Sequence, residues 1–236
     1  MVKVMQCWDD GVTTDLRLIE LLRKYEAKAT FNLNPALHGE TRSASGWAPA
    51  GHTGWSYKGF LPGKLAKHEL LDVYSDFQVA SHCMRHETAG RVPDADFLKA
   101  ALDARHFLED LFQRPCRGFA WPCGRYTQEL ADAMLAEGFA YGRTTENSEH
   151  VVDSPHPMIL HSSGHFANNN FYECYEKAKQ ENGIFYFWGH SYEMMDSEGM
   201  WNQLELKLKF IHDDPEAVWC DLADIDWKNL CGKNRP

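Results

Sequence analysis

The chain has 236 residues, of which 44% are hydrophobic and 13% aromatic, a length and composition that suit a globular protein with a sizeable core and exclude a disordered one. The formal charge is −10, from 24 Lys and Arg against 34 Asp and Glu. No basic block or stripe interrupts this acidic balance, so nucleic acids and membranes are not expected as partners.

The cysteines and the N-terminus indicate a compartment. Seven cysteines are scattered along the chain without a Cys-x-x-Cys pair, which predicts reduced thiols rather than a disulfide framework. The N-terminus carries no charged segment followed by a long apolar run, and the longest apolar stretch, near 184–188, is too short to span a bilayer. We therefore expect a cytoplasmic protein. No pattern in the sequence predicts its oligomeric state.

Strand-like and helix-like segments alternate along the whole chain. Apolar strands are expected at 2–7, 29–33, 77–80, 118–121, 139–143, 158–161, 184–189 and 217–222. Helical periodicity is expected at 16–25, 68–74, 94–112, 128–137, 171–180 and 201–212. Residues 35–65 form the longest irregular stretch, and loops of that length are usually functional or disordered. About seven β/α repeats predict a parallel α/β sheet, either a barrel or doubly wound, in one domain over residues 1–236.

Polar side chains stand where several of these strands end. The groups are Asp9 and Asp10, His82 and His86, the run Pro122-Cys123-Gly124, and His190. The carboxyl ends of parallel strands form the active face of such folds, so we expect these groups to converge on one rim.

His82 and His86 have the spacing of a metal-ligand pair. On one helical turn, an i, i+4 spacing would put both imidazoles on the same face, although such a pair also occurs on solvated helices. Two imidazoles and one carboxylate leave a coordination position open for water. Asp9 and Asp10 cannot point the same way from an extended strand end. One of them could therefore bind a metal while the other takes a proton.

Taken together, these motifs resemble the polysaccharide deacetylase family, the NodB-homology carbohydrate esterases. Its TFDDG-like motif is matched by Cys7-Trp8-Asp9-Asp10-Gly11, and its H-[ST]-x-x-H motif by His82-Cys83-Met84-Arg85-His86. Its RPPYG-like motif is matched by Ala120-Trp121-Pro122-Cys123-Gly124, and its late hydrophobic-x-His motif by Trp188-Gly189-His190. The resemblance implies an irregular (β/α)7-type barrel.

The resemblance also implies a role for each matched residue. Asp10, His82 and His86 would bind one divalent metal ion; zinc is the first expectation, and cobalt, nickel, manganese or iron would also suit. Asp9 would be the general base, and His190 the general acid that protonates the departing amine. The backbone N–H of Cys123 would stabilise the oxyanion.

Departures from the family pattern mark a divergent member. Ala120 stands where the family usually has an Arg that tethers the base, and Arg143 is one candidate replacement. The Asp that usually orients the acid has no clear counterpart, and Asp153 or Glu146 could substitute.

Four residues near these motifs are candidate substrate contacts, namely Trp121, Pro122, Arg143 and His165. The aromatic residues Trp47, Trp55 and Tyr57 of the long irregular stretch could add a platform for sugar rings.

The leading hypothesis is a metal-dependent hydrolase that removes the acetyl group from an N-acetylated sugar or oligosaccharide. Two alternatives remain: a metal-dependent amidohydrolase acting on a non-sugar linear or cyclic amide, and a catalytically impaired, metal-bearing saccharide-binding protein. The expected partner is a saccharide or a small amide substrate.

Overall fold

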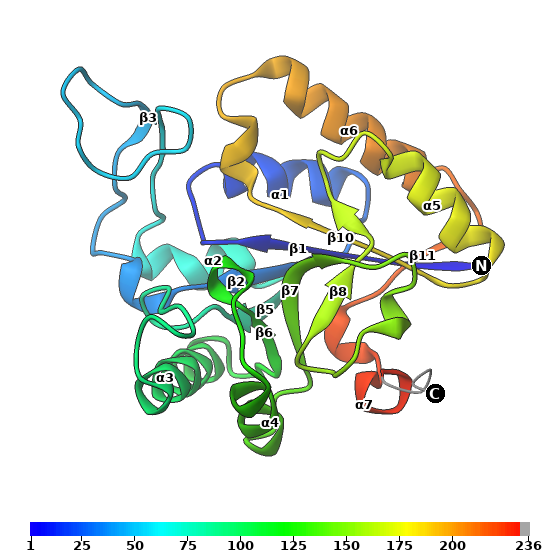
Figure 1. Cartoon of the computed structure of the whole chain (residues 1–236). Coiled ribbons are helices and arrows are strands. Elements are labelled where there is room, and N and C mark those ends of the chain that lie inside the picture. Colours follow the sequence, from blue (N-terminus) through cyan, green and yellow to red (C-terminus); the bar gives the residue numbers. More distant parts are fainter. Residues whose placement is uncertain (232–236) are drawn as a thin grey trace.

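Strands and helices alternate in the computed structural model, which describes residues 1–231 (Figure 1). The main strands are β1 (Val2–Asp9), β2 (Thr30–Leu33), β5 (Gln78–Ser81), β6 (Gly118–Ala120), β7 (Tyr141–Asn147), β8 (Leu160–Ser162), β9 (Gly164–His165), β10 (Ile184–Gly189) and β11 (Ala217–Trp219). The helices are α1 (Asp15–Lys24), α2 (Leu70–Tyr74), α3 (Asp94–Phe112), α4 (Gln128–Ala136), α5 (Phe171–Gln180), α6 (Glu198–His212) and α7 (Trp227–Leu230).

The main sheet is parallel and runs in the order β8-β7-β6-β5-β2-β1-β10-β9, with β11 added beside the first residues of β1. β8 pairs with β7 and β9 pairs with β10, and only Ser163 separates β8 from β9. The Ser163 N–H donates to the carbonyl oxygen of Tyr186 in β10 at 2.7 Å. The 160–165 segment therefore leads the sheet back to its other edge, in agreement with the predicted parallel α/β fold of the barrel type.

Strand alternation divides the side chains between the inside of this sheet and its helical cover. Met5 and Cys7 of β1 belong to an inner cluster with Tyr141, Leu160 and Tyr186, which come from β7, β8 and β10. Successive residues of a strand point to opposite faces, so Asp9 and Arg143 continue the inner rows of β1 and β7. The same alternation that fills the core thus carries charged side chains to the inner rim at the carboxyl ends.

Helices cover the outer face of the curved sheet (Figure 1). α1, α5 and α6 pack against side chains of β1 and β10, and α3 and α4 pack against Phe119 of β6. In α3, Phe97, Ala101, Ala104 and Leu108 recur at helical spacing and are fully buried. Burial of each large apolar side chain contributes roughly 1.5–3 kcal/mol. No helix within residues 1–231 is long and apolar enough to cross a membrane.

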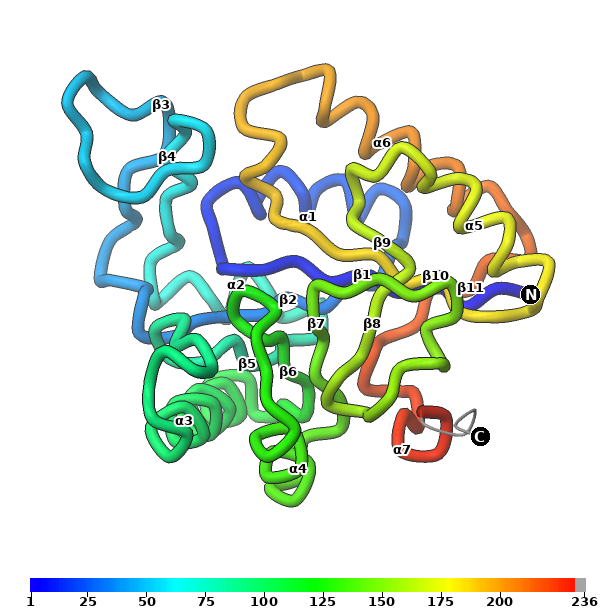
Figure 2. Tube along the Cα trace, in the orientation of Figure 1, coloured from blue at the N-terminus to red at the C-terminus, as the bar shows by residue number. Residues whose placement is uncertain are grey.

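Two local expectations need correction. Residues 82–86 form a turn rather than a helix, with Cys83 at φ 60° and His86 at φ 62°, and the Asn34 amide donates to the carbonyl oxygens of His82 and Cys83. The long irregular stretch contains the antiparallel hairpin β3 (Ser45–Trp47) and β4 (Phe60–Pro62). In the tube of Figure 2 this hairpin projects from the body of the molecule.

Candidate active site

A cavity of about 570 Å³ lies at the carboxyl ends of the strands. Its chemically active lining comes from four strand ends and comprises Asp9, Asp10, His82, His86, Arg143 and His190. The sequence-predicted base, acid and metal ligands therefore share one cavity, as expected for the carboxyl ends of parallel strands.

Asp10, His82 and His86 form a group suited to a metal ion, because one ligand atom from each lies within 4.8 Å of those of the other two. The His82 and His86 rings meet edge to face, with centroids 4.7 Å apart. Asp10 has φ 86° and so turns away from the direction of Asp9. At the next position only glycine fits, since a Cβ on Gly11 (φ 63°) would stand 2.7 Å from the His38 ring.

The protonation states of His82 and Asp10 suit a cation. His82 Nδ1 lies 2.7 Å from the carbonyl oxygen of Ala120, which fixes Nδ1 as the donor and leaves Nε2 as the ligand atom. Burial lowers the pKa of His82 to about 4, so this imidazole is neutral near pH 7. Burial alone would raise the pKa of Asp10, but the Lys64 ammonium, 3.5 Å from its Oδ1, acts together with the nearby histidines His190 and His82 to hold this pKa at about 2.

Asp9 is buried in a set of hydrogen bonds that keep it ionised. Its Oδ1 accepts from Asn32 Nδ2 at 2.7 Å, and Arg143 donates to both of its carboxylate oxygens. Although burial opposes ionisation, the Arg143 guanidinium holds the pKa of Asp9 well below its usual range. The Arg143 guanidinium also lies 4.6 Å from the centroid of the Trp188 ring.

Arg143 reaches Asp9 from the strand next to the one that the family motif uses. Ala120 of β6 and Arg143 of β7 are register partners in the parallel sheet. Neighbouring strands lie only about 4.8 Å apart, so a long guanidinium side chain can reach the same inner space from either position. This chain lacks an Arg at position 120, but Arg143 on the neighbouring strand pairs with Asp9 instead.

His190 lies on the other side of Asp9, with its Nε2 3.6 Å from Asp9 Oδ2. Glu193 Oε2 accepts the backbone N–H of His190 at 3.0 Å and stands 3.5 Å from its Nδ1 and 2.7 Å from His165 Nε2. Burial opposes protonation of His190, but Glu193, with Asp9 and Asp10, raises its pKa overall.

Sequence reasoning missed Glu193 as a neighbour of the predicted acid. The candidates named from the sequence were Glu146 and Asp153. Glu146 instead accepts from Tyr126 Oη at 3.0 Å and lies 3.1 Å from His161 Nε2, and Asp153 ends the short turn Val151–Asp153. The available signal was the i, i+3 spacing of His190 and Glu193, which the 3-10 turn Ser191–Met194 brings together.

A buried carboxylate ties the His190 turn to the start of α1. Asp15 accepts hydrogen bonds from the Ser191 hydroxyl, from Tyr74 Oη at 2.7 Å and from the Val12 N–H at 3.2 Å. Burial raises the pKa of Asp15 to about 6. The segments that follow Asp10 and His190 are therefore joined through one side chain.

Of the four predicted substrate contacts, Trp121 and Arg143 are among the described residues that line the cavity, whereas Pro122 and His165 are not. Trp121 lines the cavity, but its ring is fully buried, stacks on Phe97 with centroids 5.4 Å apart and donates to the Met158 carbonyl oxygen. Pro122 is buried behind it, and His165 is engaged by Glu193.

Cys123 also lines the cavity, in a left-handed conformation with φ 57°. No hydrogen-bond acceptor for its backbone N–H is found among residues 1–231. This N–H is therefore left without a hydrogen-bond partner in the described part of the chain, in a residue that borders the cavity.

The long loop supplies an aromatic wall to the cavity. Trp55 and Tyr57 contact Tyr192 at centroid distances of 5.6 and 5.4 Å, and Tyr192 lies 4.8 Å from the His190 ring. Trp55 remains 64% exposed, whereas Trp47 donates its indole N–H to Asp196 at 2.8 Å. Trp55 and Tyr192 thus border the cavity beside the predicted acid.

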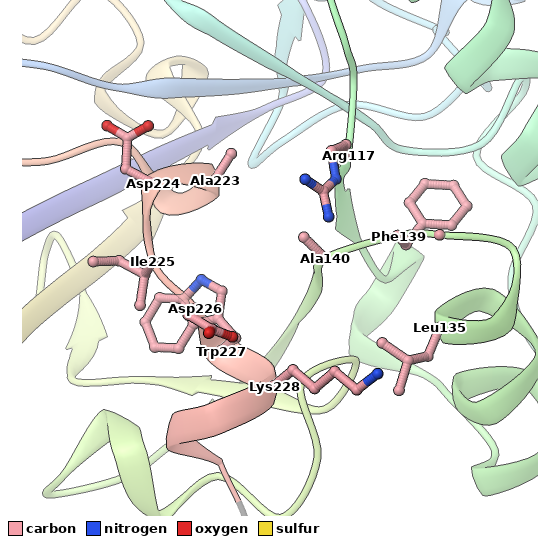
Figure 3. Close-up of a pocket in the computed structure, with 11 residues that line it drawn as sticks. Arg117, Leu135, Phe139, Ala140, Ala223, Asp224, Ile225, Asp226, Trp227 and Lys228 are labelled. Carbon is pink, nitrogen blue, oxygen red and sulfur yellow. The ribbon is translucent and has the colours of Figure 1, made fainter.

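A second cavity, of about 530 Å³, lies at the amino ends of β6 and β7 (Figure 3). Arg117, Ala140 and the segment 223–228 border it. Its acidic groups have local roles: Asp226 caps α7, accepting from Asn229, and Asp224 lies 3.8 Å from Lys28.

All seven cysteine thiols are free in the structure, as the scattered cysteines of the sequence predict.

Comparisons with known proteins identify the family and the fold. Residues 2–142 match the family model described as polysaccharide deacetylase, and no curated protein matches the chain. A putative polysaccharide deacetylase from Mycobacterium smegmatis aligns with a TM-score of 0.61 and 10% identity over 97% of this chain and 90% of that one. Peptidoglycan deacetylase PdaC from Bacillus subtilis aligns with a TM-score of 0.54 and 11% identity over 97% and 91%.

A third structure, the Streptococcus pyogenes deacetylase PplD, aligns with a TM-score of 0.47 and 17% identity over 60% of this chain, which spans about half (55%) of that one. The alignments with the Mycobacterium smegmatis and Bacillus subtilis structures, at about 10% identity, show a shared fold alone. The family model, in contrast, covers more than half of the sequence. The chain belongs to the polysaccharide deacetylase family.

Proposed function

We propose that this protein is a metal-dependent deacetylase that hydrolyses the N-acetyl group of a sugar or oligosaccharide. Family membership supports deacetylation of a sugar polymer as the general reaction. The observation that carries the finer proposal is the convergence of Asp9, His190 and the group Asp10, His82 and His86 on one cavity.

The donor set fits a divalent ion such as zinc. Asp10 offers a carboxylate, His82 and His86 offer imidazole nitrogens, and the Ala120 carbonyl oxygen accepts from His82 Nδ1 and so orients its ring. A divalent ion bound there would act as a Lewis acid and make water a better nucleophile near neutral pH.

Asp9 and His190 divide the proton transfers between them. The Arg143 ion pair keeps Asp9 ionised, so its carboxylate can accept a proton from the attacking water. His190, whose pKa is raised, can donate a proton to the departing amine, which an amide needs in order to leave. The free N–H of Cys123 would donate to the oxyanion of the tetrahedral intermediate.

Both proton-transfer residues face the cavity, which supports an enzyme over an impaired saccharide-binding protein. The exposed Trp55 ring at its edge supports a sugar ligand over a small non-sugar amide, because aromatic faces pack on apolar sugar faces.

The test is acetate release by metal-loaded protein from N-acetylglucosamine oligomers, acetylated muropeptides, O-acetylated sugars and a simple linear amide. We expect release from an N-acetylated sugar, its loss on chelation, and a fall of roughly 10²- to 10⁴-fold in Asp9→Asn. Asp224→Asn, a carboxylate at the second cavity, is the matched control and should behave as the parent protein.

Metal analysis tests the ligands separately. His82→Ala and His86→Ala should each lose stoichiometric metal, whereas Asp9→Asn should keep it. Full metal content in both histidine variants would refute the ligand assignment. Release of acetate by Asp9→Asn at the parent rate would refute the base, and hydrolysis of the linear amide alone would establish the amidohydrolase.

A further inference from the structure

One cation at the active-site cavity has no ion-pair partner. Arg91, in the loop between β5 and α3, lines the cavity and is exposed, and within residues 1–231 no carboxylate lies within ion-pair distance of it. Its backbone N–H donates to the Thr88 carbonyl oxygen at 3.0 Å, which fixes the turn that carries it. The turn thus places Arg91 at the cavity, and its side chain has no ion-pair partner among residues 1–231.

The other charges of the cavity are already engaged. Arg143 pairs with Asp9, and Lys64 lies 3.5 Å from Asp10. The lining therefore holds two carboxylates and, with Arg91, three cations, before any metal ion or protonated His190 is counted. This local excess of positive charge occurs in a chain whose formal charge is −10.

A second arginine approaches the same turn. A guanidinium nitrogen of Arg125, in the loop after β6, stands 3.7 Å from where a Cβ on Gly90 would lie, and Gly90 directly precedes Arg91. Arg125 also lacks an ion-pair partner in the described part of the chain. Two arginines without carboxylates near one turn favour an anion from outside the protein.

We propose that Arg91 is an anion subsite at the edge of the cavity, which binds a carboxylate or phosphate group carried by the N-acetylated substrate. The guanidinium fork matches the paired oxygens of either group and can donate two parallel hydrogen bonds. This inference rests on the proposed function and names the class of substrate: an N-acetylated amino sugar that bears a negative charge.

The experiment compares one neutral and two anionic substrates of similar size. N-acetylglucosamine is the neutral substrate, N-acetylmuramic acid carries a carboxylate, and N-acetylglucosamine 6-phosphate carries a phosphate. kcat and KM for acetate release are measured with parent protein, Arg91→Gln and Arg117→Gln. Arg117 is an exposed arginine at the second cavity, so its variant controls for loss of one positive charge.

We expect the parent to prefer one or both anionic substrates. In Arg91→Gln this preference in kcat/KM should fall about 10- to 100-fold, mainly through KM, as for loss of a charge-assisted hydrogen bond. Arg117→Gln should keep the parent preference. The two anionic substrates show whether the carboxylate or the phosphate is the ligand.

A binding arm separates failure of the subsite from failure of the deacetylase proposal. Calorimetry measures glucosamine, muramic acid and glucosamine 6-phosphate binding, which needs no turnover. Tighter binding of an anionic amine that Arg91→Gln abolishes would support the subsite even if no acetate were released. Equal binding and equal kcat/KM for neutral and anionic compounds would overturn it, as would an Arg91→Gln variant that retains the preference.

Discussion

The two large cavities differ little in volume, about 570 and 530 Å³, but they lie at opposite ends of the strands and hold their charges differently. At the carboxyl ends, Asp9 and Arg143 are buried and bonded to each other. At the amino ends, Asp224 lies 3.8 Å from Lys28 at the surface and Asp226 caps α7 (Figure 3). Arg117 is exposed there.

Size alone therefore does not distinguish the candidate active site from the second cavity. Burying a charge costs free energy unless it is paired and hydrogen-bonded, so a protein keeps buried charges where they are compensated. Such compensated groups with displaced pKa values are typical of functional sites. Substitutions at the two cavities should therefore differ in their effect on stability and activity.

The largest effect is expected from Arg143→Gln. It leaves the Asp9 carboxylate buried without its cation, which should lower the free energy of unfolding by about 3–5 kcal/mol. Urea denaturation measures this loss, and acetate release should fall with it. Arg143→Lys keeps the charge but not the fork, so its loss should be smaller. Equal stability of Arg143→Gln and the parent would show that the pair is not compensating a buried charge.

Asp15→Asn should change how stability depends on pH. The folded protein holds the Asp15 proton more tightly than the unfolded chain, since its pKa rises from 3.8 to about 6. Stability from this group is therefore present below about pH 4 and is lost as the pH rises through 6. Relative to the parent, the variant should gain about 3 kcal/mol between pH 4 and pH 7, measured by urea denaturation at both. Parallel pH profiles would contradict the assignment.

Glu193→Gln should lower kcat more than it changes KM. The fall in kcat should be smaller than the roughly 10²- to 10⁴-fold that general acid catalysis contributes. Without the Glu193 charge, the pKa of His190 should fall, because this charge helps to raise it. The alkaline limb of the kcat/KM profile should then move to lower pH. His165→Gln keeps Glu193 and should move the limb less. An unmoved limb in Glu193→Gln would leave this residue only a structural role.

The smallest effects are expected at the amino-end cavity. Arg117→Gln and Lys228→Gln should change the free energy of unfolding by less than about 0.5 kcal/mol, as for ordinary surface positions. Their kcat/KM should stay within about twofold of the parent, because they lie at the far end of the strands. A marked loss of acetate release in either variant would break the distinction between the two cavities.

The sequence predicted the strands and the polar residues that follow them, because burial produces a periodic pattern that can be seen locally. It did not predict the turn at 82–86, where the Asn34 side chain binds carbonyl groups 48 and 49 residues away. An i, i+4 histidine pair resembles a helix face, and the helix prediction was wrong because such a distant contact leaves no local pattern.

The sequence named Arg143 as a candidate partner of the base, but it did not point to Glu193 as the partner of the acid. Arg143 is 134 residues from Asp9, and only the pairing of β6 with β7 places it beside the family position at Ala120. Glu193 is close to His190 in sequence, but the 3-10 turn that brings them together depends on contacts made elsewhere, including that of Ser191 with Asp15.

The register of Ala120 with Arg143 has a consequence for how such enzymes are recognised. A motif defined by consecutive sequence positions scores position 120 as a lost functional residue. A motif defined by register partners in the sheet instead scores one guanidinium beside Asp9, supplied from either of the two paired positions 120 and 143. Chains that carry a small residue on one strand and an arginine on its neighbour would then be grouped with active members instead of being set aside as defective.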